Sequence, residues 1–113
     1  CIYAHGTATP QNDLAEVSCF RRVFGRHLTS LPVVSTKGAI GHLMGAAGAV
    51  ETALAVWAAQ ARRSPGTATL VEPDPEFADL RLPTAAFDLA AGAILKTSLG
   101  FGGHLAAILV QSP

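Results

Sequence analysis

The chain has 113 residues, enough for one small domain or for part of a larger one. Half of the residues are hydrophobic and 14% are charged, with eight basic residues balanced by eight acidic ones. This balance argues against a nucleic-acid-binding protein, which needs a basic face. The low charge content predicts that part of the apolar surface packs against a further segment.

Cysteine, histidine and apolar content exclude several other classes. Cys1 and Cys19 are too few for a disulfide framework and favour a reduced, cytoplasmic setting. The four histidines lack a ligand spacing to one another or to the cysteines, so we expect no bound metal. The apolar stretch 43–59 contains Glu51, which favours a core helix over a membrane span. There is no signal-peptide pattern, and the only methionine is Met44, so we expect an excerpt or a processed piece.

Hydrophobic spacing predicts two helices. In the first, apolar residues recur at helical intervals over residues 14–25, and Asp13 followed by Glu16 offers a start similar to a capping box. The second is a long Ala-rich helix over residues 42–62, which a Ser-Pro-Gly sequence then stops.

Short apolar runs predict the strands, at residues 1–4, 31–36, 93–98 and 105–111. The last two are joined through a Gly-rich turn and should form an antiparallel pair. Prolines break the segment 67–90 into loops and short strand pieces. The resulting β-α-β-α-β-β order predicts an α/β domain with a mostly parallel sheet and an antiparallel edge. Ligands of such sheets lie outside the carboxyl ends of the strands.

Several chemically useful groups fall at this expected edge. His5 and Lys37 each follow a strand, and the glycines of residues 100–103 follow another. His42 stands at the expected start of the long helix, where unpaired N–H groups and the helix dipole favour a neutral imidazole. Ordinary interpretations remain open, since a lone histidine can satisfy a backbone group or cap a helix, and Gly-rich hairpins are common. Lys37 and Glu51 could be separate surface charges, but a carboxylate inside an oily helix needs a counter-charge.

These segments resemble the motifs of β-ketoacyl-acyl-carrier-protein synthases, condensing enzymes of the thiolase fold. Residues 4–10 match the family's Ala-His-Gly-Thr-x-Thr-Pro segment, residues 35–51 resemble its signature almost continuously, and residues 100–103 match its Gly-Phe-Gly-Gly turn. The 35–51 run is more similar to elongating synthases of dissociated fatty acid synthesis than to modular polyketide synthases. The resemblance implies one domain over residues 1–113, the C-terminal half of a thiolase-like fold, without the N-terminal half that carries the nucleophilic cysteine.

The resemblance also implies a reaction and its central residues. His5 and His42 would be the two active-site histidines, and Lys37 and Glu51 would pair beside them and organise the site. The implied reaction is a decarboxylative Claisen condensation, in which malonyl-carrier protein loses carbon dioxide and attacks an acyl thioester on a cysteine. The implied partners are the acyl carrier protein, the N-terminal half and a second copy in a homodimer. No cofactor is implied, because phosphopantetheine arrives on the carrier protein.

Further residues are implied to contact the substrate. Thr7 and Thr9 would line the phosphopantetheine channel as hydroxyl donors to its amides. Leu99, Gly100 and Phe101 would form a turn that supplies an oxyanion-hole N–H and gates the acyl pocket. The family usually has phenylalanine where Leu99 stands, so we expect this gate to differ.

Two alternatives to the enzyme remain. A synthase-like partner subunit, comparable to the chain-length factors of polyketide systems, is favoured by the departures Thr97, Leu99 and His104. The second alternative is a non-enzymatic half-domain that serves as an interaction module. Neither Cys1 nor Cys19 lies in a nucleophile motif, so we expect no condensing activity from this chain alone.

Overall fold

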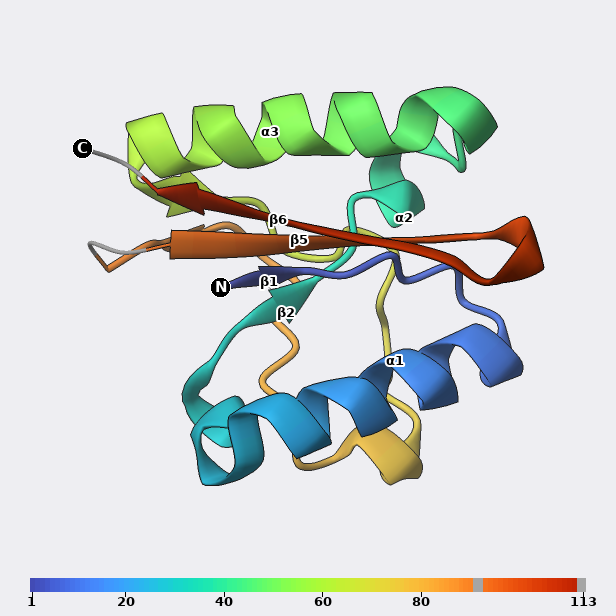
Figure 1. The fold of residues 1–113 in the computed structure, drawn as a ribbon. Helices are drawn as coiled ribbons and strands as arrows, with labels where there is room; N and C mark the ends of the chain where they lie inside the picture. The colour runs from blue at the N-terminus through green and yellow to red at the C-terminus, as the bar shows by residue number, and fades with distance from the viewer. Residues whose placement is uncertain (91–92, 112–113) are drawn as a thin grey trace.

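The computed structural model describes residues 1–90 and 93–111, and its main sheet has four strands in the order β2-β1-β5-β6 (Figure 1). These strands are β1 (Ile2–Tyr3), β2 (Val33–Val34), β5 (Ala93–Gly100) and β6 (His104–Gln111). Strand β1 is parallel to both β2 and β5, whereas β5 and β6 are antiparallel. The predicted mixed sheet with an antiparallel edge is therefore confirmed.

Helices cover both faces of this sheet. In Figure 1, α1 (Pro10–Phe24) lies on one side and α3 (Ala47–Ala61) on the other, giving three layers. The short helix α2 (Lys37–Ile40) connects β2 toward α3. Short 3-10 turns occupy Gly25–Ser30, Met44–Ala46, Pro75–Phe77 and Phe101–Gly103. A small antiparallel pair, β3 (Arg63–Ser64) and β4 (Phe87–Asp88), completes the described elements.

Alternation along β1 divides the core between the two faces of the sheet. Ile2 packs with Phe20 and Leu28 on the α1 side, whereas Tyr3 packs with Ala55 on the α3 side. Successive side chains of a strand point to opposite faces, so even this short strand contributes to both layers. Ala55 is fully buried, and its small side chain lets α3 lie close to the sheet.

Helix α1 begins earlier than the sequence predicts. Its first residue is Pro10, its N-cap is Thr9, and the N–H of Asp13 donates to the Thr9 carbonyl oxygen at 3.0 Å. Proline suits this position because an N–H in the first turn has no partner within the helix. The predicted capping by Asp13 and Glu16 is therefore wrong, and the Glu16 carboxylate is available for other contacts.

The helix predicted over residues 42–62 begins later than expected, at Ala47. Gly41 ends α2 with a φ of 75°, Met44 has a φ of 50°, and α3 starts only at Ala47. Left-handed backbone at these positions prevents one continuous helix. His42 therefore lies in an irregular segment before α3, and the helix-terminus argument for its neutral form does not apply.

Helix α3 and strand β6 each leave large apolar side chains exposed. Trp57 on α3 is 69% exposed, and Leu105 and Leu109 on β6 are 75% and 65% exposed. Strand β6 is also an edge of the sheet, with backbone groups that can pair with another strand. Isolated domains rarely expose so many large apolar side chains, so the structure supports the expectation that a further segment packs against this domain.

Candidate active site

Three strands deliver polar groups to one edge of the sheet. Because β1, β2 and β5 run parallel, their carboxyl ends meet at the same edge. His5 lies just beyond β1, Lys37 begins α2 just beyond β2, and the turn that includes Gly100 and Phe101 ends β5. Binding sites of open α/β sheets form at this edge.

The two histidines named by the sequence lie together here. The ring centroids of His5 and His42 are 5.4 Å apart, with the ring planes at 83°, an edge-to-face arrangement. The N–H of Met44 donates to Nδ1 of His42 at 3.1 Å, so the neutral His42 ring carries its hydrogen on Nε2. Nδ1 of His5 is buried and has no hydrogen-bond partner within the described residues. An unpartnered buried nitrogen suits a site that a substrate completes.

The surroundings of His5 favour its neutral form. Burial lowers the pKa of His5 below its ordinary value of 6.5, and the positive charge of Lys37 lowers it further. Glu16 acts in the opposite direction, while Lys96 and His42 again lower the pKa. The imidazole can therefore donate or accept a hydrogen bond near neutral pH.

The backbone of His5 is held by Glu16, a site residue that sequence reasoning missed. Oε1 of Glu16 accepts the N–H of His5 at 2.8 Å, and Oε2 accepts the N–H of Gly6 at 3.0 Å. The hydroxyl of Thr97 also donates to Oε1, at 2.6 Å. The available sequence signal was an acidic residue directly beside Val17, on the buried face of an amphipathic helix.

Lys37 and Glu51 form a buried ion pair, and a second lysine joins it. Nζ of Lys37 lies 2.5 Å from Oε1 of Glu51. Nζ of Lys96 lies 2.8 Å from Oε2 of Glu51, in an ion pair that lacks the geometry of a hydrogen bond. Burial alone would raise the pKa of Glu51, but the hydrogen bond from Lys37 and the charge of Lys96 outweigh it and lower the pKa. Sequence reasoning missed Lys96, although alternation along β5 places it on the same buried face as Ile94.

The remaining predicted site residues follow β1 or end β5, and all of them are partly or fully exposed. The hydroxyls of Thr7 and Thr9 share an exposed hydrogen bond of 2.9 Å. Leu99 is half-buried near the end of β5, whereas Gly100 is exposed and Phe101 is 89% exposed. These groups are accessible to a ligand that approaches the carboxyl edge.

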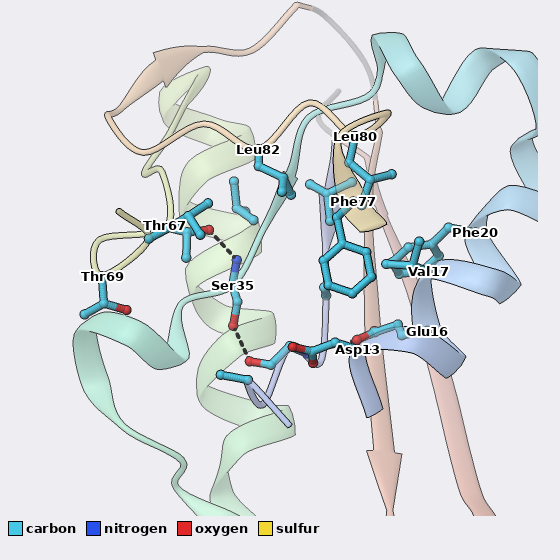
Figure 2. Close-up of a pocket in the computed structure, with 16 residues that line it drawn as sticks. Asp13, Glu16, Val17, Phe20, Ser35, Thr67, Thr69, Phe77, Leu80 and Leu82 are labelled. Carbon is cyan, nitrogen blue, oxygen red and sulfur yellow. Dashed lines mark hydrogen bonds between the residues drawn. The ribbon is translucent and has the colours of Figure 1, made fainter. Parts of the chain in front are cut away.

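A pocket of about 240 Å³ lies between α1 and residues 67–82 (Figure 2). It also borders residues 4–8, the segment that carries His5 and is called the His5 loop below. Its walls are mostly apolar, with the carboxylates of Asp13 and Glu16 at one end. Ser35 joins the surrounding segments, because its hydroxyl donates to the Gly6 carbonyl oxygen at 2.9 Å and its N–H donates to the Thr67 hydroxyl at 3.0 Å. The His5 loop is thus tied both to α1 and to the segment after β2.

The described part of the chain has neither a cluster of metal-binding side chains nor a helix that could span a membrane. Residues 1–90 and 93–111 contain no group of three histidine, cysteine or acidic side chains that could hold a metal ion. Of the helices in those ranges, none combines the length and the apolar character needed to span a bilayer. Cys1 and Cys19 are free thiols, and Cys19 is exposed on α1.

Residues 1–71, which contain both histidines and the Lys37–Glu51 pair, match the family model described as β-ketoacyl synthase, C-terminal domain. The chain belongs to this family. The resemblance read from the three sequence motifs is therefore confirmed.

Similar proteins agree with the family assignment. The domain is 42% identical over 103 residues to 3-oxoacyl-[acyl-carrier-protein] synthase 2 of Coxiella burnetii, covering 90% of this chain and 25% of the relative. A chain from the solved complex of a type II polyketide synthase acyl-carrier protein with its ketosynthase bound to the hexaketide gives a TM-score of 0.92 at 30% identity, covering 99% of this chain and 28% of that chain. A β-ketoacyl synthase from Burkholderia phymatum STM815 gives a TM-score of 0.86 at 30% identity, covering 96% and 26%.

These comparisons confirm a thiolase-like ketosynthase fold. The chain spans about a quarter of the length of the curated relative and of the solved ketosynthases.

Proposed function

We propose that this chain is the C-terminal catalytic part of a β-ketoacyl-acyl-carrier-protein synthase in fatty acid or polyketide biosynthesis. The observation that carries this proposal is the His5–His42 pair, with ring centroids 5.4 Å apart at the carboxyl edge of the sheet. The buried Lys37–Glu51 pair beside it and the family membership support the same reaction class. The nucleophilic cysteine would come from the remainder of the enzyme, since neither Cys1 nor Cys19 lies in a suitable motif.

The reaction would proceed by a decarboxylative Claisen condensation. The malonyl thioester loses carbon dioxide, and the electron pair of the broken C–C bond forms an enolate with its charge on the thioester oxygen. Nε2–H of His42 is free to donate to such an oxygen because Nδ1 already accepts the N–H of Met44. A neutral His5 can donate to the same oxygen or assist the cysteine. The enolate carbon then bonds to the acyl carbonyl carbon, and the cysteine thiolate leaves and takes up a proton.

The supporting residues would have two roles: an ion pair would hold the helices of the site together, and other residues would contact the substrate. Lys37 and Glu51 hold α2 against α3 and so place the segment that carries His42. Thr7 and Thr9 would offer their exposed hydroxyls to the amides of a phosphopantetheine arm. The turn of Leu99, Gly100 and Phe101 would supply the oxyanion contact and the gate to the acyl pocket.

The partners follow from the same proposal. The acyl carrier protein would deliver acyl and malonyl groups, and the rest of the synthase would cover the apolar surface of α3 and β6. The complete enzyme would work as a homodimer in the cytoplasm, without a resident cofactor.

The first experiment would express the complete gene product and incubate it with acyl-acyl-carrier protein. Intact mass then reports any acyl adduct, and malonyl decarboxylation is followed in the wild type, His5→Ala and His42→Ala. An adduct on a cysteine outside this chain, with decarboxylation lost in both variants, supports the condensing enzyme.

A partner subunit without a nucleophile is the second candidate, because Leu99 replaces the usual gate residue and the similar structures include a ketosynthase/chain length factor. The absence of both an adduct and a nucleophilic cysteine would favour this subunit. A stable monomer of residues 1–113 without either activity would favour an interaction module.

A further inference from the structure

The pocket between α1 and residues 67–82 has walls that are joined by side-chain contacts. The guanidinium of Arg21 on α1 donates to both carboxylate oxygens of Asp79, at 3.0 and 2.6 Å. It also donates to the carbonyl oxygen of Glu76 at 2.7 Å. These bonds hold the segment that carries Phe77 against the helix, so the pocket is formed before any ligand enters it.

The lining of this pocket combines an apolar wall with one acidic end (Figure 2). Large apolar side chains contribute much of the wall, namely Val17, Phe20, Phe77, Leu80 and Leu82. The charged groups among the described lining residues are the carboxylates of Asp13 and Glu16, without a lysine, arginine or histidine. An apolar cavity of about 150 Å³ can hold benzene, so a pocket of about 240 Å³ has room for one ring with a short chain.

The two carboxylates at the acidic end have no cation of their own. Asp13 and Glu16 are three residues apart on α1, a spacing at which like charges repel on a helix surface. Neither forms an ion pair with a basic side chain of residues 1–90 and 93–111. Arg21, on the same helix, is paired with Asp79 instead. Glu16 is only 5% exposed, and buried carboxylates are usually paired, so a positive charge at this end would be favourable.

We propose that this pocket binds a small organic ammonium ion, a protonated primary amine on an aryl or alkyl body. The apolar body would lie against the wall and restore the dispersion contacts that an open cavity lacks. The ammonium would lie at the acidic end and donate to Asp13, which is half-buried and therefore within reach of a ligand. A metal ion fits less well, because the described residues offer no third histidine, cysteine or acidic ligand beside these two.

The test uses the complete protein at pH 7 and three probes of one shape. They are 3-phenylpropylamine, which is a cation, the neutral 3-phenylpropan-1-ol and the anion 3-phenylpropanoate. Ligand-observed NMR titrations give the dissociation constant of each probe for the wild type, Asp13→Asn and Phe77→Ala. Leu80→Ala replaces Phe77→Ala should that variant not fold. Glu72→Gln is the matched control, because it also removes one negative charge but from an exposed position outside the pocket.

We expect the amine to bind with a dissociation constant of about 1 mM or below, as suits a ligand of this size. The alcohol should bind about tenfold more weakly, because it lacks the charge-assisted hydrogen bond, and the anion should not bind. Asp13→Asn should weaken the amine about tenfold and leave the alcohol unchanged. Phe77→Ala should weaken both, because it removes part of the apolar wall, whereas Glu72→Gln should change neither.

Three results would overturn the inference. They are the absence of saturable amine binding, equal affinities for the amine and the alcohol, and amine binding that neither Asp13→Asn nor the wall variant weakens. None of these measurements requires turnover. Amine binding by a protein that does not decarboxylate malonyl-carrier protein would therefore support the pocket and count against the proposed function. An active synthase that does not bind the amine would do the reverse.

Discussion

Glu16 holds His5 by its backbone and leaves the ring free. Its two carboxylate oxygens accept the N–H groups of His5 and Gly6, at 2.8 and 3.0 Å. Gly6 has a φ of 46°, and a Cβ at this position would lie 2.7 Å from the Cβ of Ser35, so the chain turns where only glycine fits. The turn leaves both N–H groups without a strand partner, and a carboxylate from α1 satisfies them. The backbone that carries the His5 ring is thus held by the helix that follows it in the sequence.

We expect Glu16→Gln to weaken both stability and activity. An amide presents one acceptor and one donor end, so one of the two backbone N–H groups loses its partner. The free energy of unfolding should fall by about 1–3 kcal/mol, and malonyl decarboxylation by about tenfold because His5 is displaced. Urea unfolding and a decarboxylation assay of the complete protein measure the two effects. Glu72→Gln, at an exposed position, is the control, and equal behaviour of the two variants would contradict the expectation.

A contact between two site residues could be predicted where one continuous motif contains both of them. It could not be predicted where the two residues come from distant segments of the sequence. Lys37 and Glu51 lie in one continuous signature, and a glutamate among apolar residues indicates a buried counter-charge. Lys96 joins them only because β5 lies beside β1 in the folded sheet. The alternation of residues along β5 predicts which face of the strand is buried, but it does not predict which helix packs on that face.

The fold shows the same limit. The antiparallel pair β5–β6 was predictable because its strands are consecutive and flank a glycine turn. The break before α3 was not, because Met44 adopts a positive φ that its residue type does not favour. Such a conformation depends on tertiary contacts, so His42 was wrongly placed at a helix start.

Glu51→Gln should be among the most damaging substitutions in the domain. It removes the carboxylate that two buried lysines share, and an uncompensated buried charge costs about 3–5 kcal/mol. Lys37→Met should cost less, because Lys96 still answers Glu51. Chemical unfolding of both variants gives the comparison, and a larger loss in Lys37→Met would show that Lys96 does not pair with Glu51.

Stability should fall in acid partly because of His5. Its pKa is lowered in the folded state, so the unfolded chain binds the proton more readily. The contribution is therefore complete above the ordinary value of 6.5 and is lost as the pH falls below it. Unfolding temperatures of the wild type and His5→Gln between pH 7.5 and pH 5 test this sign. The variant should show the shallower decline, and parallel curves would be evidence against a lowered pKa.

Leu99→Phe should change which acyl chains are accepted. Leu99 is half-buried at the proposed gate, and a larger aromatic ring would narrow it. One change of this size in an apolar pocket alters discrimination by about tenfold. Competition between a short and a long acyl-carrier protein, read by intact mass, should shift toward the shorter chain. An unchanged ratio would place the gate elsewhere.

The apolar surface of α3 and β6 should make residues 1–113 associate when they are produced alone. Trp57 and Leu109 are 69% and 65% exposed, and the β6 edge offers unpaired backbone groups. Light scattering after gel filtration should detect oligomers, and Leu109→Lys should reduce them because a charge on an edge strand opposes pairing. Trp57 is the only tryptophan of these 113 residues, so its fluorescence should shift to the blue when the remainder of the synthase is added. A monomer with no such shift would mean that this surface does not face the rest of the enzyme.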